Sequence, residues 1–171
     1  MAVIEAIHGD ITHQTVDAIV NAANTTLLGG GGVDGAIHRA AGPELLEECH
    51  ALGGCPTGEA RITKGYRLPA KQVIHAVGPV YRDGKHGEPE KLKAAYRHCL
   101  ELAEAHGLVS IAFPAVSTGA YRYPKREAAE IALGTCLEWL QGHALPEKVV
   151  FVLFGAGDLA VYREVLEQVR F

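Results

Sequence analysis

The chain has 171 residues, of which 48% are hydrophobic and 21% charged, and this composition predicts one globular domain, residues 1–171, with a substantial core. Its formal net charge of −4 and its pI of about 6.1 argue against binding of nucleic acid through bulk electrostatics, although a local basic pocket stays open. No apolar stretch reaches the length of a membrane span, the first residues lack the regions of a signal peptide, and the four cysteines form no C-x-x-C pair. We therefore expect a soluble, cytoplasmic protein with reduced thiols and no membrane association.

Short β-branched runs alternate with longer helical patterns along the chain. In chain order, the expected elements are strands 3–8 and 18–20, helices 34–41 and 43–52, strands 60–63 and 73–77, helix 90–106, strand 110–113, helix 125–140, strand 149–154 and helix 159–169. The polar stretch 82–89 is predicted to be an exposed mobile loop. This alternation is typical of an α/β domain with a largely parallel sheet that is covered on both faces.

Unusual segments follow four of the predicted strands. They are residues 9–12, 21–34, 114–121 and 154–157. In open α/β sheets, ligands bind outside the carboxyl ends of the strands. We expect the first three segments to share one rim of the sheet, and the fourth can join them there.

The most informative of these segments holds four consecutive glycines, residues 29–32, directly before a predicted helix. Glycine lets backbone N–H groups approach a ligand closely, and the positive end of the helix dipole favours an anion. Asp34 places a carboxylate beside that anion position, which a loop for anion binding alone would avoid. Structural roles remain possible: Asp34 as an N-cap that contributes about 1 kcal/mol, Asn21 and Asn24 as turn residues, and His38 as a packed side chain. Their convergence with the glycine loop favours a functional site.

Several other motifs are incomplete. Gly30, Gly32 and Gly35 have the spacing G-x-G-x-x-G, but residues 22–28 separate them from the strand and no P-loop is present. Ser117 does not stand in a G-x-S-x-G nucleophile elbow, so the loop around it is interpreted as a second backbone cradle for phosphate. The nine histidines and four cysteines show neither H-E-x-x-H nor paired spacing, so no metal and no cofactor are predicted.

Six ordered motifs together resemble the macro domain family, and within it the MacroD-type ADP-ribosyl hydrolases. They are residues 9–12, 21–24, 29–42, 68–71, 77–79 and 113–119, which extend over most of the chain. The resemblance implies a three-layer α/β/α sandwich with a central mixed, largely parallel sheet. It also implies that the ligand is ADP-ribose.

The resemblance further assigns roles to individual residues. Asp10 accepts from the exocyclic amine of adenine beside the Ile11 backbone, and Phe154 stacks on the base, at a position where many relatives carry tyrosine. The expected pyrophosphate clamp consists of backbone groups of Gly31, Gly32, Val33, Ser117, Thr118, Gly119 and Ala120. Asn21 is counted among the ligand contacts, Asn24 holds the distal ribose, Tyr121 packs against it, and Asp34 orients or deprotonates the attacking water. A zinc-dependent branch of the family carries Cys and His ligands around this loop, and residues 24–35 contain neither.

The implied activity is removal of single ADP-ribose units from acidic side chains of modified proteins, together with deacetylation of O-acetyl-ADP-ribose. Water attacks either the anomeric carbon or the acyl carbonyl, and the base is either Asp34 or a pyrophosphate oxygen. The alternatives are a module that binds ADP-ribose without turnover and a phosphatase acting on ADP-ribose 1″-phosphate. ADP-ribosylated nucleic-acid ends are less favoured as substrates because the net charge is acidic.

Overall fold

The computed structural model describes residues 3–170 and contains every strand and helix expected from the sequence, with ends that differ by up to three residues. The strands are β1 (Val3–His8), β2 (Ala18–Ala22), β3 (Ala60–Lys64), β4 (Gln72–Ala76), β5 (Ser110–Phe113) and β6 (Lys148–Leu153). The helices are α1 (Gly32–Ala41), α2 (Pro43–Leu52), α3 (Glu88–Ala105), α4 (Lys125–Gly142) and α5 (Ala156–Arg170), with a short 3-10 turn, η1, at Ile11–His13.

The six strands form one mixed sheet in the order β1-β6-β5-β2-β4-β3. All neighbours are parallel except β3, which runs antiparallel to β4 at the edge. The four contiguous strands β1, β6, β5 and β2 therefore end at the same rim, and the segments that follow them lie there. This confirms the shared rim expected from the sequence, including its fourth segment.

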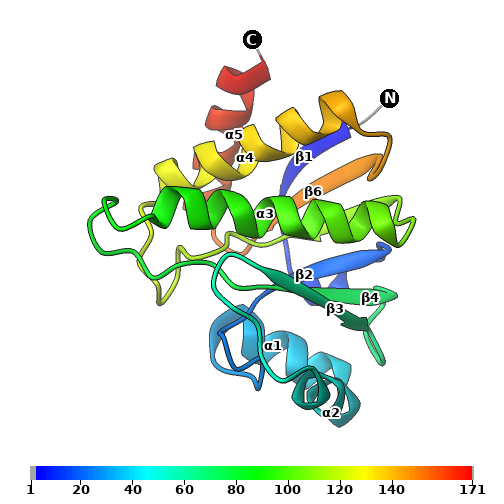
Figure 1. Ribbon diagram of the computed structural model, residues 1–171. Coiled ribbons are helices and arrows are strands. Elements are labelled where there is room, and N and C mark those ends of the chain that lie inside the picture. The colour runs from blue at the N-terminus through cyan, green and yellow to red at the C-terminus, as the bar shows by residue number, and fades with distance from the viewer. Residues whose placement is uncertain (1–2, 171) are drawn as a thin grey trace.

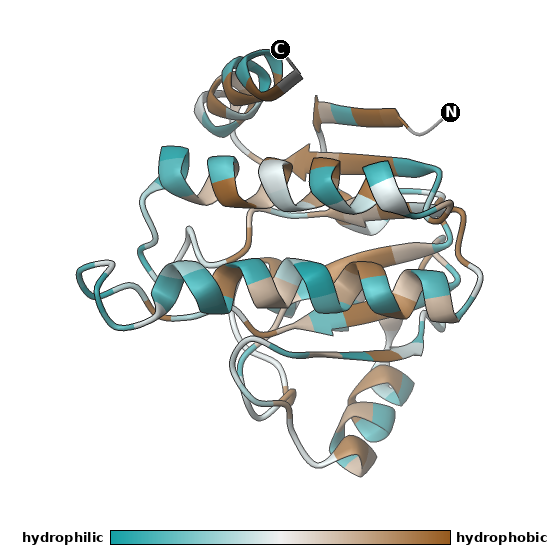
Figure 2. Ribbon diagram, turned by 45° about the horizontal axis from the view of Figure 1, so that its top comes forward, coloured by the Kyte–Doolittle hydropathy of each residue, from teal (hydrophilic) through white to brown (hydrophobic). Residues whose placement is uncertain are grey.

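Helices cover both faces of the sheet and complete the three-layer sandwich. Helices α3, α4 and α5 lie on one face and α1 and α2 on the other (Figure 1). Strand β6 shows why both faces are covered: Phe151 and Leu153 pack toward α3–α5, whereas Val150 and Val152 pack toward the opposite helices. Figure 2 shows the resulting pattern, with largely apolar strands between helices that carry polar and apolar bands.

Helix α1 begins two residues before its predicted start, so Asp34 lies inside the helix and not at its N-terminal boundary. Gly31 is the N-cap, and Gly32, the first helical residue, has a φ of 57°, which favours glycine. Asp34 is consequently the third residue of the helix, and its side chain is buried. The N-cap alternative for Asp34 is therefore wrong, because a cap side chain stands outside the first turn.

The loop at residues 82–89 is organised around a buried carboxylate. Glu88 is 2% exposed, and its two oxygens accept hydrogen bonds from the backbone N–H groups of Arg82, Asp83, Gly84 and His86. Burial alone would raise the pKa of Glu88, but these hydrogen bonds outweigh it and lower the pKa to about 2. The expectation of an exposed loop is correct for most of the segment and wrong for Glu88, which starts α3 and anchors the turn.

Candidate functional site

A cavity of about 800 Å³ lies at the carboxyl ends of β1, β6, β5 and β2. All the site residues predicted from the sequence line this cavity, with the exception of Asn21. They are Asp10, Ile11, Asn24, Gly31, Gly32, Val33, Asp34, Ser117, Thr118, Gly119, Ala120, Tyr121 and Phe154. The sheet thus brings together residues that are up to 144 positions apart in the chain, Asp10 and Phe154 being the most distant pair.

At one end of the cavity, Asp10 and Phe154 follow the neighbouring strands β1 and β6. The Oδ1 atom of Asp10 accepts hydrogen bonds from the hydroxyl (2.6 Å) and the backbone N–H (2.9 Å) of Thr12, and these lower the pKa of Asp10. The carboxylate is therefore a fixed, ionised acceptor. The Phe154 side chain is 84% exposed, which leaves its ring available for stacking.

The glycine loop and the N-terminus of α1 form a second wall of the cavity. A Cβ atom added to Gly31 or Gly32 would meet no protein atom within 4 Å, so both residues border open space. The first turn of a helix has N–H groups without partners in the helix, and here they adjoin the cavity. This arrangement suits an anionic ligand.

The loop that follows β5 forms the opposite wall. Ser117 has a φ of 68°, and its carbonyl accepts a hydrogen bond from Tyr123 N–H at 2.9 Å. Ser117 Oγ is buried, forms no hydrogen bond within residues 3–170, and lies where a Cβ on Gly78 would collide with it. Because no base among residues 3–170 contacts this hydroxyl, the geometry gives no support to a nucleophilic role for Ser117.

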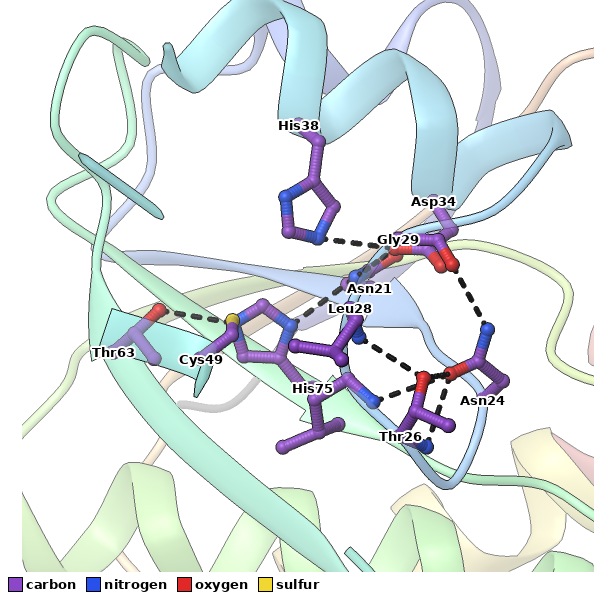
Figure 3. Close-up of polar contacts among 11 residues, drawn as sticks. Asn21, Asn24, Thr26, Leu28, Gly29, Asp34, His38, Cys49, Thr63 and His75 are labelled. Carbon is purple, nitrogen blue, oxygen red and sulfur yellow. Dashed lines mark hydrogen bonds and ion pairs between the residues drawn. The ribbon is translucent and has the colours of Figure 1, made fainter. Parts of the chain in front are cut away.

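Asp34 is the buried carboxylate of the site, with an exposed fraction of 5%. Its Oδ1 atom accepts a hydrogen bond of 2.8 Å from Asn21 Nδ2, and His38 Nε2 lies 3.4 Å from the same oxygen (Figure 3). Oδ2 lies toward Gly30 and accepts no hydrogen bond from the described residues. One oxygen is therefore held by the protein, and the other is open to the cavity.

Asn24 and Gly30 lie beside this open oxygen. Asn24 Oδ1 accepts from the backbone N–H groups of Thr26 and Leu27 and from the Thr26 hydroxyl, while Nδ2 donates to Gly29 O at 3.0 Å. Asn24 is thus a turn residue, as one alternative held, and it also lines the cavity with one Nδ2 proton left for a ligand. A Cβ at Gly30 would lie 3.3 Å from Asp34 Oδ2 and 3.5 Å from Asn24 Nδ2.

Three residues of the site were missed by sequence reasoning or assigned differently: Asn21, His75 and Gly30. Asn21 is fully buried behind Asp34 and does not line the cavity. The structure therefore gives no support to the direct contact with the ligand that was expected for it. Behind it, His75 from β4 is also fully buried and contacts the Asn21 amide. The sequence did hold a signal for His75, because it is a lone histidine within the apolar run of β4. Gly30, which was not among the predicted site residues, belongs to the same run of glycines as Gly31 and Gly32.

One group of three potential metal ligands occurs in residues 3–170, and it does not include a residue of the cavity wall. Asp83, His86 and Glu88 bring a ligand atom each within 4.8 Å of one another. Both Glu88 oxygens already accept backbone hydrogen bonds, and His86 Nδ1 lies 2.8 Å from Asp83 Oδ1. Glu88 and His86 are therefore already engaged, by backbone N–H groups and by Asp83 respectively.

The fold and the cavity define an α/β sandwich with a cleft at one rim of its sheet, whose glycine loop and helix N-terminus suit an anionic ligand. Comparison with known proteins identifies the family: the Macro domain model matches residues 20–132, and the chain belongs to the macro domain family. A macro domain-containing protein of Chlorobaculum tepidum is 62% identical over 95% of both chains. An O-acetyl-ADP-ribose deacetylase of Citrobacter koseri is 57% identical over 94% of this chain and 93% of its own.

A solved structure extends the comparison to a bound ligand. The Trypanosoma brucei macrodomain in complex with ADP-ribose matches 94% of this chain and 68% of its own with a TM-score of 0.88 and 49% sequence identity. These matches confirm the expected fold and family. Among the described residues, no helix combines the length and apolarity that spanning a membrane requires.

Proposed function

We propose that this macro domain is an ADP-ribosyl ester hydrolase that deacetylates O-acetyl-ADP-ribose and removes single ADP-ribose units from acidic side chains of proteins. Relatives named O-acetyl-ADP-ribose deacetylase, at 54–57% identity over most of the chain, support the first activity. The second uses the same ester chemistry on a larger acyl group.

In the proposed complex, ADP-ribose extends along the whole cavity. Adenine stacks on Phe154 and donates its amine to the Asp10 carboxylate. The pyrophosphate lies between the glycine loop and the loop after β5, where backbone N–H groups meet it. The distal ribose then lies against Asn24 and Tyr121, next to the open oxygen of Asp34.

The observation that carries the proposal is the buried carboxylate of Asp34 at this end of the cavity. A module that only binds an anionic ligand gains nothing from a carboxylate there, because the two negative charges repel. A catalyst that must bring water to an ester does need such a group, because a carboxylate can accept a proton from the attacking water. Asp34 Oδ2 is therefore suited to orient a water molecule or to accept its proton, and a pyrophosphate oxygen is the alternative base.

The overall reaction consumes one water molecule. The ester bond breaks, the acyl group leaves as a carboxylic acid, and ADP-ribose retains or receives the hydroxyl, depending on whether water attacks the acyl carbonyl or the anomeric carbon. Reaction in water labelled with ¹⁸O distinguishes the two routes, since the label enters the acid in the first case and the ribose in the second.

The test is separate incubation with O-acetyl-ADP-ribose, with a protein carrying ADP-ribose on a glutamate and with ADP-ribose 1″-phosphate, followed by mass analysis of the products. We expect free ADP-ribose from the first two substrates. Binding without product would show a non-catalytic module, and release of inorganic phosphate from ADP-ribose 1″-phosphate alone would show a phosphatase.

Phe154→Ala should weaken ADP-ribose binding by about 1–3 kcal/mol, because base stacking is lost while the reaction centre is untouched. Isothermal calorimetry measures this change, and kcat should stay near its parental value. Because the ring is 84% exposed, its removal should leave the thermal unfolding temperature unchanged. Unchanged affinity would move the adenine platform to another residue.

Turnover should persist after exhaustive chelation with EDTA, because no open ligand set for zinc or magnesium adjoins the cavity in the described part of the chain. The rate on O-acetyl-ADP-ribose is measured before and after dialysis against the chelator. Activity that disappears and returns with added metal would contradict this expectation.

A further inference from the structure

The carboxylate of Asp34 is the end of a chain of buried hydrogen bonds that starts on β3. Asn21 Nδ2 lies 2.8 Å from Asp34 Oδ1 and 3.1 Å from His75 Nδ1, and His75 Nε2 lies 2.9 Å from Thr63 Oγ1 (Figure 3). Thr63 Oγ1 in turn donates to the carbonyl of Lys64 at 3.2 Å. Asn21, Thr63 and His75 are each 2% exposed or less, so water does not compete for these bonds.

The donors and acceptors in this chain can be arranged in one consistent way. An ionised Asp34 only accepts, so Asn21 must turn its NH₂ group toward it. The second Asn21 proton points at His75 Nδ1, which must then carry a lone pair. His75 is neutral, since burial and, to a smaller extent, His38 lower its pKa to about 3. Its one proton therefore lies on Nε2 and is donated to Thr63, whose own proton goes to Lys64 O.

The orientation of the Asn21 amide is not set by its own hydrogen-bond needs. With NH₂ used twice, Asn21 Oδ1 is left buried without a hydrogen-bond partner in the described structure. Such an atom is normally satisfied, because burying it unpaired is unfavourable. The opposite orientation would point the amide oxygen of Asn21 at the Asp34 carboxylate, so that two acceptors would face each other. The amide is therefore held by the groups on both sides of it.

We propose that His75 and Thr63 are positioning residues for hydrolysis, which fix the Asn21 amide and through it the direction of the Asp34 carboxylate. This inference rests on the proposed function of Asp34. Thr63 fixes the tautomer of His75, His75 fixes the amide, and the amide holds Oδ1 so that Oδ2 faces the water. Neither residue lines the cavity, so neither contributes to ADP-ribose affinity.

The tautomer is tested directly by ¹⁵N NMR of the histidine rings in the parental protein at pH 7. We expect His75 to show a protonated Nε2 and an unprotonated Nδ1. A protonated Nδ1 would overturn the proposal, because it would place two donors against each other at Asn21. This measurement needs no substrate and does not depend on a variant that folds.

The kinetic test is Thr63→Val, which keeps the shape of the side chain and removes the acceptor for His75 Nε2–H. We expect kcat on O-acetyl-ADP-ribose to fall about 10-fold, less than the roughly 10²-fold that a misplacement of 1 Å can produce. Cys49 Sγ, 3.7 Å from the same nitrogen, remains as a weaker acceptor. KM and the affinity for ADP-ribose should stay within twofold, and Thr63→Ser should restore kcat.

Thr135→Val is the matched control. Thr135 is also buried, and its hydroxyl donates to Ile131 O at 2.6 Å within α4, outside the cavity wall. The Thr135→Val variant should lose about as much thermal stability as Thr63→Val and keep the parental kcat. An equal fall of kcat in both variants, or parental kcat in Thr63→Val, would overturn the positioning role alone. A parental protein that hydrolyses no ester would instead overturn the proposed function and the positioning role with it.

Discussion

Asp34→Asn is expected to lower the hydrolysis of O-acetyl-ADP-ribose by about 10²–10⁴-fold, the range for losing a general base. The substitution keeps the shape of the side chain, and its amide oxygen can still accept the hydrogen bond from Asn21. The affinity for ADP-ribose should hold or rise, because a negative charge beside the pyrophosphate is removed. Steady-state kinetics and calorimetry on the same preparation measure both effects.

The combination of lost turnover and retained binding is what distinguishes a catalytic carboxylate from a structural one. The thermal unfolding temperature of the variant, which should stay close to the parental value, controls for damage to α1. Hydrolysis at the parental rate would leave Asp34 with a structural role and move the catalytic assignment to Asn24, Tyr121 or a phosphate of the substrate.

Gly30→Val is expected to lower hydrolysis by at least about 10²-fold, the effect of displacing reacting groups by about 1 Å. The new Cβ would lie 3.3 Å from Asp34 Oδ2 and 3.5 Å from Asn24 Nδ2. We expect the two methyl groups to take up space proposed for the distal ribose. The ligands respond differently. ADP-ribose should bind more weakly, whereas ADP, which lacks that ribose, should keep its affinity.

Gly134→Val serves as the control for Gly30→Val. Gly134 lies within α4, and a Cβ there meets no atom within 4 Å, so this variant should fold and turn over substrate as the parent does. Equal loss of affinity for ADP and ADP-ribose in Gly30→Val would show that the loop as a whole had moved. Parental hydrolysis would show that Gly30 does not face the reaction centre.

The strands and helices could be predicted from the sequence because their patterns are local. The apolar run of β6 alternates between two covered faces, and the helix 125–140 carries apolar residues at helical spacing, so both were found with ends close to those of the structure. The start of α1 was placed too late because glycine has a low helix propensity. The structure nevertheless begins the helix at Gly32, with Gly31 as the N-cap and its carbonyl accepting from Gly35 N–H at 3.2 Å.

The site was predictable as a set of segments, since carboxyl ends of parallel strands share a rim. Its polar interior was not. The amide of Asn21 contacts His75, which is 54 positions away. The two residues are brought together by the pairing of β2 with β4, which cannot be recognised from the sequence of either segment alone. Glu88 is a similar case, because its carboxylate is buried by N–H groups of a polar stretch that by itself indicates an exposed loop.

The position of β6 has a consequence for the order in which the protein can acquire its binding capacity. This strand is the last one in the described residues, and it lies between β1, the first, and β5. A nascent chain that lacks β6 also lacks Phe154, and β1 then has no neighbour in the sheet, so the end of the cavity formed by Asp10 and Phe154 is not yet in place. The glycine loop and the loop after β5 are synthesised earlier and adjoin strands that already pair. During synthesis, recognition of the nucleotide must therefore be among the last properties to form, and ligand binding then stabilises the completed sheet as a whole.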